Sequence, residues 1–293
     1  QGQADDLLTT LVLALNAPLA LAPAMNQAMW LDAATQDNAQ LLQRRGAHLF
    51  GPAEGSQACG DTGPGRMLEA DDLAECLSCL FASGALAGLR VTITAGPTRE
   101  AIDPVRFISN HSSGKMGYAL AEAAVEAGAL TTLISGPVAL PSPSKVDLVR
   151  VNSAKEMHAA SMTAAASCDI FIATAAVADY RPKKAASQKI KKGEPTMVLE
   201  LERNPDIISA VAALQPGPFC VGFAAETENV TEHARSKLLG KGLDLIFAND
   251  VARTGIGFNS DENQVTLIGP AETVILEQAP KERLARMLIS EIA

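Results

Sequence analysis

From residue 89 to the C-terminus, short apolar segments alternate with longer segments that have the pattern of helices. The apolar segments lie at 89–95, 130–135, 147–151, 169–175, 219–224 and 243–248. The helical segments lie at 116–128, 205–214 and 231–239, and a capping box of Ser153 and Glu156 opens one more. Strands that are buried on both faces read as continuous apolar runs, and intervening helices are typical of parallel strands. The sequence therefore predicts an α/β fold with a doubly wound, largely parallel, Rossmann-like sheet.

The first part of the chain has a different pattern. It holds expected strands at 18–22 and 48–50, helices at 32–45 and from Asp71, and a loop at 51–67 that is rich in Gly and Pro. Small residues near Ala85 resemble a linker, so the predicted domains are 1–85 and 86–293. An antiparallel hairpin at 264–268 and 273–277, followed by a helix from Lys281, is expected to complete the second domain. Because the chain starts at Gln1, we expect it to be a fragment of a longer protein.

Composition excludes several classes of function. The net charge of −9 argues against a nucleic-acid partner, because nucleic-acid phosphates require a basic surface. No apolar run is long enough to span a membrane, so no membrane association is expected. The five cysteines have no pairing pattern, which favours a reducing, cytoplasmic location.

Small and polar residues follow directly after the predicted strands. They lie at 96–98, 136–137, 175–177, 224–226 and 249–250. In an open parallel sheet, the carboxyl ends of the strands line the crevice in which ligands bind. The sequence therefore predicts a ligand site at this edge of the sheet, although loops favour such residues in any case.

The segment 106–117, RFISNHSSGKMG, lies between a strand and a helix and resembles a phosphate-binding loop. It lacks the first Gly and the final Ser/Thr of a Walker A motif, and it has no G-x-G-x-x-G spacing. What remains is a Ser/Gly-rich turn that can direct backbone N–H groups and a helix N-terminus at an anion. The alternative is a plain glycine turn.

A basic run follows the strand end at 175–181 in this otherwise acidic chain. Its lysines are Lys183, Lys184, Lys189, Lys191 and Lys192. One interpretation is a mobile lid that neutralises a triphosphate, with Asp179 close to a nucleotide or its metal. The other is an ordinary solvated charge run.

Two further segments carry weaker signals. Asn204, Pro205 and Asp206 open a helix, and capping alone would explain them. Lys237 and Lys241 lie four residues apart on one helix face, an arrangement that is usually only surface.

Taken together, these segments resemble the phosphopantothenate–cysteine ligase family of coenzyme A biosynthesis. The resemblance runs in order from residue 89 to the C-terminus, through TAGPTR (94–99), DPVRFISNHSSGKMG (103–117), AAVADY (175–180), KIKK (189–192), NPDI (204–207), GFAAET (222–227) and ANDV (248–251).

The resemblance implies the reaction and the residues that serve it. The carboxylate of 4′-phosphopantothenate would attack the α-phosphorus of CTP, with Mg²⁺ on the triphosphate, and the amine of L-cysteine would then displace CMP. It implies catalytic roles for Lys189 and Asn110. The nucleotide would contact Ala175, Asp179, Lys189, Pro205, Asp206, Ile207, Ile208, Phe223, Lys237 and Lys241. The metal ligands stay unknown. A homo-oligomer is expected, as a ligase dimer or a larger assembly with the full decarboxylase half.

The N-terminal part resembles the flavin-dependent phosphopantothenoylcysteine decarboxylase that precedes the ligase in bifunctional bacterial proteins. The resemblance rests on PAMN (23–26), QACGD (57–61) and GPGRM (63–67). It implies that Asn26 holds the substrate carboxylate and that Cys59 protonates the enethiolate left after decarboxylation. The family's FMN-binding first half has no counterpart here, so we expect a truncated, flavodoxin-like remnant without decarboxylase activity of its own.

Two alternatives remain open on the residues alone. One is a Rossmann-type oxidoreductase, which the missing glycine fingerprint disfavours. The other is a nucleotide-binding dimeric partner protein without ligase activity. Retention of Asn110 and Lys189 disfavours this reading, since a binding module has little need of them.

Overall fold

The computed structural model describes residues 2–57, 60–81, 83–191, 196–226, 230–250 and 260–293. The chain divides into two compact units, residues 1–82 and 83–293, and each is described by itself. The sequence-based boundary near Ala85 lies close to this division.

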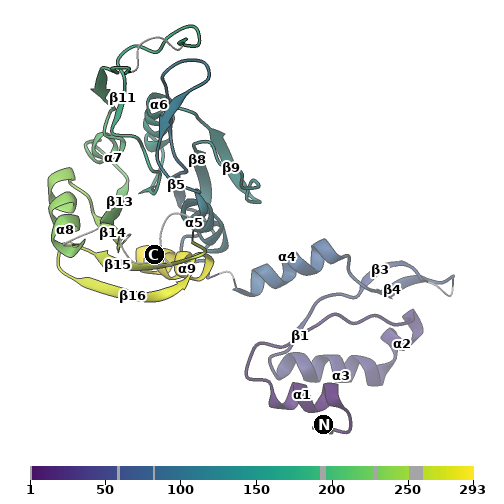
Figure 1. The fold of residues 1–293 in the computed structure, drawn as a ribbon. Coiled ribbons are helices and arrows are strands. Elements are labelled where there is room, and N and C mark those ends of the chain that lie inside the picture. Colours follow the sequence, from purple (N-terminus) through teal and green to yellow (C-terminus); the bar gives the residue numbers. More distant parts are fainter. Residues whose placement is uncertain (1, 58–59, 82, 192–195, 227–229, 251–259) are drawn as a thin grey trace. The chain divides into compact units, whose positions relative to one another are not determined.

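The N-terminal unit is built from short helices and two small sheets (Figure 1). Parallel strands β1 and β2 form one sheet, and the antiparallel hairpin β3–β4 forms the other. The bounds are α1 Leu7–Ala14, β1 Ala20–Leu21, α2 Gln27–Leu31, α3 Ala33–Arg44, β2 His48–Leu49, β3 Ala53–Ser56, β4 Thr62–Arg66 and α4 Ala70–Phe81. The hairpin replaces the loop expected at 51–67. β3 (AEGS) and β4 (TGPGR) consist of small and polar residues without apolar alternation, so hydrophobic periodicity does not reveal them as strands.

An eight-stranded sheet forms the centre of the second unit, in the order β16-β15-β14-β13-β10-β5-β8-β9. The six strands from β14 to β9 are parallel, and β15 and β16 add antiparallel edges. Their bounds are β5 Arg90–Ala95, β8 Leu130–Ser135, β9 Val146–Arg150, β10 Ile170–Ala173, β13 Phe219–Glu226, β14 Leu245–Asp250, β15 Glu262–Ile268 and β16 Thr273–Pro280. The predicted doubly wound, largely parallel sheet is confirmed.

Helices cover both faces of this sheet (Figure 1). One face carries α5 and α9, which pack on each other and on β5, β8, β15 and β16. The other carries α6, α7 and α8, which pack on β5, β8, β13 and β14. The bounds are α5 Lys115–Glu126, α6 Ala154–Ala165, α7 Ile207–Ala212, α8 Val230–Lys241 and α9 Lys281–Ile292. Each face has its own buried core, and small Ala side chains let α5 approach the strands closely.

The direction of the chain across the sheet reverses between β5 and β10. From β5 the chain adds β8 and β9 on one side, and it then returns to add β10, β13 and β14 on the other. Such a reversal leaves a crevice at the carboxyl ends of the two central strands, which is where α/β proteins bind ligands. The crevice expected from the sequence therefore has a defined place between β5 and β10.

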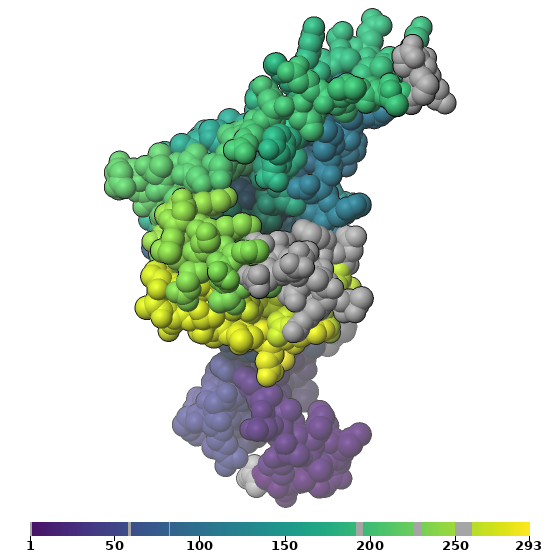
Figure 2. Space-filling model, turned by 60° about the vertical axis from the view of Figure 1, so that its left-hand side comes forward, coloured from purple at the N-terminus to yellow at the C-terminus, as the bar shows by residue number. Residues whose placement is uncertain are grey.

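Two small hairpins were not expected from the sequence. Strands β6 (Arg99–Ala101) and β7 (Phe107–Ser109) pair antiparallel, as do β11 (Tyr180–Pro182) and β12 (Leu201–Arg203). β6 and β11 are in contact, and Figure 2 shows the green part of the chain around β11 and β12 standing out from the body of the unit. In the part of the chain that the structure describes, no helix is long and apolar enough to cross a membrane.

Gly117 allows α5 to lie against the central strand. A Cβ at this position would come within 2.5 Å of the Ala95 Cβ and 2.6 Å of the Thr174 Oγ1. Gly240 in α8 has nothing within 4 Å of its virtual Cβ. We expect Gly117→Ala to lower the free energy of unfolding by about 1–3 kcal/mol through overpacking. Gly240→Ala should raise it by up to about 1 kcal/mol through helix propensity. Urea denaturation followed by circular dichroism measures both, and equal stabilities of the two variants would contradict this packing.

Candidate active site

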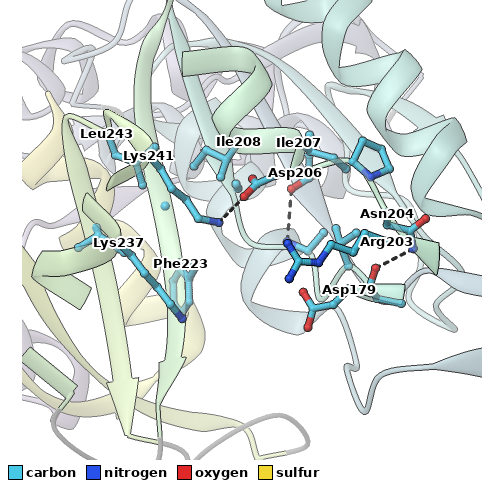
Figure 3. Close-up of a pocket in the computed structure, with 18 of the residues that line it drawn as sticks. Asp179, Arg203, Asn204, Asp206, Ile207, Ile208, Phe223, Lys237, Lys241 and Leu243 are labelled. Atoms are coloured by element: carbon cyan, nitrogen blue, oxygen red, sulfur yellow. Dashed lines mark hydrogen bonds and ion pairs between the residues drawn. The ribbon is translucent and has the colours of Figure 1, made fainter. Parts of the chain in front are cut away.

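A cavity of about 620 Å³ opens at the carboxyl ends of β10 and β13, between the start of α7 and the face of α8. The surface is hollowed between the green and yellow-green regions of these helices (Figure 2). We call it the larger cavity. The side chains that line it include Asp179, Arg203, Asn204, Pro205, Asp206, Ile207, Ile208, Phe223, Lys237, Lys241 and Leu243, and most are labelled in Figure 3. Every predicted nucleotide contact except Lys189 lies here.

Asp206 links the two helices that flank the larger cavity. Its side chain caps α7 by accepting a hydrogen bond of 3.1 Å from the Ser209 N–H, and it pairs with Lys241 at 2.8 Å (Figure 3). Burial raises the pKa of Asp206, but the hydrogen bonds from Lys241 and Ser209 and the charge of Lys241 outweigh burial, so its pKa is lowered overall. The site therefore holds an anion and a cation that neutralise each other.

The opposite wall is formed by the loop after β10. The Asn204 Nδ2 donates to the Ala178 carbonyl at 2.7 Å, and the Asn204 N–H donates to the Asp179 carbonyl at 2.8 Å. Arg181 in turn donates to the Asn204 Oδ1 at 2.8 Å. Asn204 thus connects this loop to the segment that leads into α7, a role that capping alone does not describe.

Phe223 provides the apolar surface between the two sides. Its ring stands edge-on to that of Phe247, with the centroids 6.0 Å apart and the planes at 80°. Phe247 is fully buried in the core, so it fixes the position of Phe223. A flat apolar face among charged side chains suits a ligand with a ring and an anionic group.

A smaller cavity of about 250 Å³ adjoins the first and shares Ala175, Val177 and Phe223 with it. It is lined by Asn110, Ser112, Ser113, Gly114, Lys115, Met116, Gly117, Thr174, Ala176, Asn249, Asn263 and Lys281. Gly114 caps α5 in the left-handed conformation, without a side-chain hydrogen bond to the first turn. The predicted phosphate-binding loop therefore surrounds a real cavity at a helix N-terminus.

Two buried polar side chains complete the smaller cavity. The Oδ1 of Asn249 is buried and has no hydrogen-bond partner among the described residues. Lys281 is buried and donates to the Ser260 carbonyl at 2.5 Å. Burial, followed by repulsion from Lys115, lowers the pKa of Lys281. A buried acceptor without a donor fits a cavity that receives a ligand.

Asn110 lies where the two cavities meet. Its Nδ2 donates to the carbonyl oxygens of Ala176 and Val177, at 3.2 and 3.1 Å. Both hydrogens of the amide are therefore directed at the loop after β10. A hydrogen bond from this amide to a substrate would require one of these two bonds to exchange.

Lys189 lies outside both cavities. It is exposed, on the segment that follows β11. Lys192, which belongs to the same basic run, is outside the described residues. The start of this segment is held by an ion pair of 2.6 Å between Lys183 and Glu200 and one of 2.7 Å between Arg181 and Glu202. The run is thus partly fastened to its own hairpin, which the sequence did not indicate.

In the N-terminal unit, the predicted motifs come together around Asn26. Asn26 caps α2 by accepting the Ala28 N–H at 2.8 Å, and its Nδ2 lies 3.5 Å from the Asp61 Oδ2. The neighbouring Gln27 N–H donates to the Gln57 Oε1 at 2.9 Å. Segment 23–26 is therefore adjacent to Gln57 and to segment 60–67, and Cys59 falls outside the described residues.

The described residues contain no group of three or more His, Cys, Asp or Glu side chains that could hold a metal ion. Sequence reasoning missed Arg203, Asn263 and Lys281 as cavity residues. Arg203 directly precedes the Asn-Pro-Asp motif, which is a usable signal. Lys281 and Asn263 lie on elements that reach the cavity only through tertiary packing, so no local pattern identifies them.

The fold and the paired cavities define the class, which is a doubly wound α/β protein with a ligand site at the carboxyl ends of its parallel strands. Comparison with known proteins gives the family. Residues 86–293 match the family model described as DNA/pantothenate metabolism flavoprotein C-terminal domain, and residues 1–81 match the model described as Flavoprotein. The first match covers more than half of the chain, which therefore belongs to this family of pantothenate-metabolism proteins.

The relatives narrow this to the bifunctional enzymes of coenzyme A biosynthesis. The coenzyme A biosynthesis bifunctional protein CoaBC of Vibrio cholerae is 56% identical over 97% of this chain and 72% of its own length. The crystal structure of the C-terminal domain of a CoaBC protein has a TM-score of 0.62 at 44% identity, over 72% of this chain and 96% of that one. A Cab2 variant in complex with phosphopantothenate-cysteine has a TM-score of 0.57 over 77% of this chain and 92% of that one. Its identity of 17% shows the fold alone.

These findings confirm the resemblance to the bifunctional family. Residues 1–81 match the flavoprotein model, so the N-terminal unit belongs to a flavoprotein domain, and the chain spans 72% of the length of the Vibrio cholerae relative. This match supports FMN as the cofactor of the decarboxylase part.

Two substitutions of Asp206 separate the contribution of its helix cap to the stability of the fold from the contribution of its ion pair with Lys241. Because its pKa is lowered in the fold, its charge stabilises above the unfolded value of about 3.9, and this stabilisation is lost as the pH falls through the folded value. Asp206→Asn keeps a capping oxygen, so we expect a loss below about 1 kcal/mol at pH 7 that disappears as the pH falls through the lowered pKa of Asp206. Asp206→Ala should cost about 1 kcal/mol more at pH 7. Urea titrations at several pH values test this, and a pH-independent difference for Asp206→Asn would contradict it.

Proposed function

We propose that the unit of residues 83–293 ligates L-cysteine to 4′-phosphopantothenate at the expense of CTP. The observation that carries the proposal is the pair of adjoining cavities, which share Ala175, Val177 and Phe223 at the reversal of the sheet. A reaction that activates one substrate with another needs two adjoining binding spaces, so that the reacting groups can meet.

The larger cavity suits CTP. Its volume of about 620 Å³ lies in the range of cofactor sites, and Lys237, Lys241 and Arg203 supply positive charge in an acidic chain. Entry of a triphosphate would compete with Asp206 for Lys241. Mg²⁺ usually keeps several waters and is held by substrate phosphates with one or two carboxylates, so it would arrive with the nucleotide. Asp179 is the carboxylate in this cavity that is not committed to Lys241.

The smaller cavity suits 4′-phosphopantothenate. The N–H groups at the start of α5, together with Lys115 and Lys281, favour an anionic group there. The Asn249 Oδ1 would accept a hydrogen bond from an amide or hydroxyl of the ligand. The Cab2 complex, which contains the product of such a ligation, agrees with this choice of substrate at the level of the shared fold.

The proposed chemistry has two steps. The carboxylate oxygen of phosphopantothenate attacks the α-phosphorus of CTP, the bond to the β-phosphate oxygen breaks, and pyrophosphate leaves. The amine of cysteine then attacks the acyl carbon of the resulting acyl-cytidylate. The amide bond forms as CMP leaves, and the amine gives up a proton. The protein contributes mainly positioning and neutralisation of charge.

Asn110 and Lys189 take the catalytic roles in this proposal. Asn110 stands at the common wall, where the carboxylate and the α-phosphorus would meet. Lys189 would neutralise charge at the phosphates, which requires its segment to approach the larger cavity. Cytosine would contact backbone groups near Ala175. In the flavoprotein unit, Asn26 and Cys59 would act on the ligated product, and a homo-oligomeric assembly is part of the same proposal.

The decisive assay is the release of pyrophosphate. The chain should release pyrophosphate from CTP only when phosphopantothenate and Mg²⁺ are both present, and cysteine should then raise the turnover. Pyrophosphate detection with CTP, UTP and GTP in parallel measures the rate and the choice of nucleotide. Oxidation of NAD(P)H without any use of CTP would overturn the proposal in favour of an oxidoreductase.

Substitutions at the two catalytic residues test their roles. Lys189→Gln should lower pyrophosphate release roughly 100-fold or more, because one lost charge contact at a reacting phosphate costs that much. Lys184→Gln removes an exposed lysine from the same run and is the matched control, with an expected change below about twofold. Asn110→Asp should also slow the reaction, because a carboxylate would face two carbonyl oxygens. Wild-type rates in both variants would remove these residues from the mechanism.

A further inference from the structure

The turn that joins β6 to β7 contains a buried carboxylate. Asp103 is 3% exposed, and its Oδ1 accepts hydrogen bonds of 2.8 Å from the backbone N–H groups of Val105 and Arg106. These two bonds close the turn. Stabilising a turn needs one acceptor oxygen, and the second oxygen of Asp103 is directed elsewhere.

The Asp103 Oδ2 and Arg106 together bind the backbone of Ile190. Oδ2 accepts the Ile190 N–H at 3.1 Å, and the Arg106 Nη2 donates to the Ile190 carbonyl at 3.1 Å. Arg106 also donates to the Asp103 Oδ2 from Nε at 3.0 Å and from Nη2 at 2.5 Å. Both backbone polar groups of one residue, 87 positions away in the chain, are thus held by a single ion pair.

A nearby contact strengthens the attachment. The Ala186 N–H donates to the carbonyl of Ile102, beside Asp103, at 2.9 Å. The stretch 186–190 is therefore held at two points by the β6–β7 turn. Lys189 lies between these two points, and its neighbour is the residue that the ion pair binds.

The same hairpin leads to Asn110. Strand β7 ends at Ser109, whose hydroxyl donates to the Thr98 carbonyl at 2.8 Å, and Asn110 follows at the common wall of the cavities. The turn of this hairpin holds the segment of Lys189, and its last strand delivers Asn110. One small element therefore determines where both residues stand.

We infer that Asp103 is a positioning residue for the ligation, because it holds the Lys189 segment against the hairpin that carries Asn110. This inference rests on the proposed function of Lys189. Asp103 does not touch the substrates in this account, since it lines neither cavity. It acts through the backbone of Ile190.

A carboxylate is the side chain that this position requires. The hydrogen bonds from Arg106 lower the pKa of Asp103, against the effect of burial, so both oxygens stay available as acceptors. An Asn side chain has one acceptor oxygen and one donor nitrogen. Whichever way the amide turned, its NH2 group would face either the backbone N–H groups of the turn or the Ile190 N–H, and these are donors as well.

The first test is limited trypsin digestion of Asp103→Asn, with mass spectrometry to identify cuts after Lys189 and Lys191. Cleavage follows the population of the detached segment, so we expect it to be about tenfold faster than in the wild type after loss of hydrogen bonds to a charged group. Glu200→Gln is the matched control. This substitution removes the exposed ion pair between Glu200 and Lys183, which lies on the same segment as Lys189. It leaves the Asp103 contacts intact, so the rate of cleavage should change less than about twofold.

The second test separates positioning from general damage. In Asp103→Asn, kcat for pyrophosphate release should fall about tenfold while KM for CTP changes less than about twofold, because the larger cavity keeps its lining. Circular dichroism should be unchanged. An unchanged rate of cleavage would overturn the attachment of the segment. Faster cleavage with an unchanged kcat, or a KM that rises as much as kcat falls, would overturn the role in ligation.

The two proposals fail in different ways. A wild-type chain that releases no pyrophosphate would overturn the ligase function, and with it the role of Asp103 in catalysis. The digestion experiment would still decide whether Asp103 holds the segment, since that readout needs no activity. An active wild type with an insensitive Asp103→Asn would overturn only the inference about Asp103.

Discussion

The pairing of β5 with β10 is the constraint on which the site depends. These strands are parallel neighbours, with Thr94 opposite Ala173, and the contact continues past the sheet. The Ala176 N–H donates to the Gly96 carbonyl at 2.9 Å, so the two strand-end loops are joined edge to edge. The loop after β10 becomes the wall between the two cavities. Because the chain reverses direction between these two strands, their carboxyl ends open into a crevice.

Charge in this site is arranged locally and not through the whole molecule. The chain carries a net charge of −9, yet Lys237, Lys241 and Arg203 all line the larger cavity. Asp206 already neutralises Lys241, which limits the repulsion among the cations when no anion is bound. A bound polyphosphate would replace the single carboxylate of Asp206 as the partner of Lys241 and would bring several negative charges. The site thus needs no basic surface beyond the cavity, and an acidic protein can bind an anionic substrate without attracting nucleic acid.

Elements that bury a continuous apolar surface could be predicted from the sequence, and elements held by hydrogen bonds could not. Every strand of the central sheet was expected, because the inner parallel strands are buried apolar runs and β15 and β16 follow each other as a hairpin. The hairpins β3–β4, β6–β7 and β11–β12 were missed, since they are short and expose much of their surface. Nine of the ten nucleotide contacts that the family resemblance implies line one cavity. Lys189 does not, because only tertiary contacts fix its segment.

The missed elements are also those that connect the two halves of the proposed mechanism. Hydrogen bonds between the β6–β7 turn and Ile190 span 87 residues and leave no periodic trace in the sequence. Contacts made by one ion pair and a few backbone groups are specific in geometry and modest in energy. Such contacts can hold Lys189 in a defined place and still allow its segment to approach a bound nucleotide.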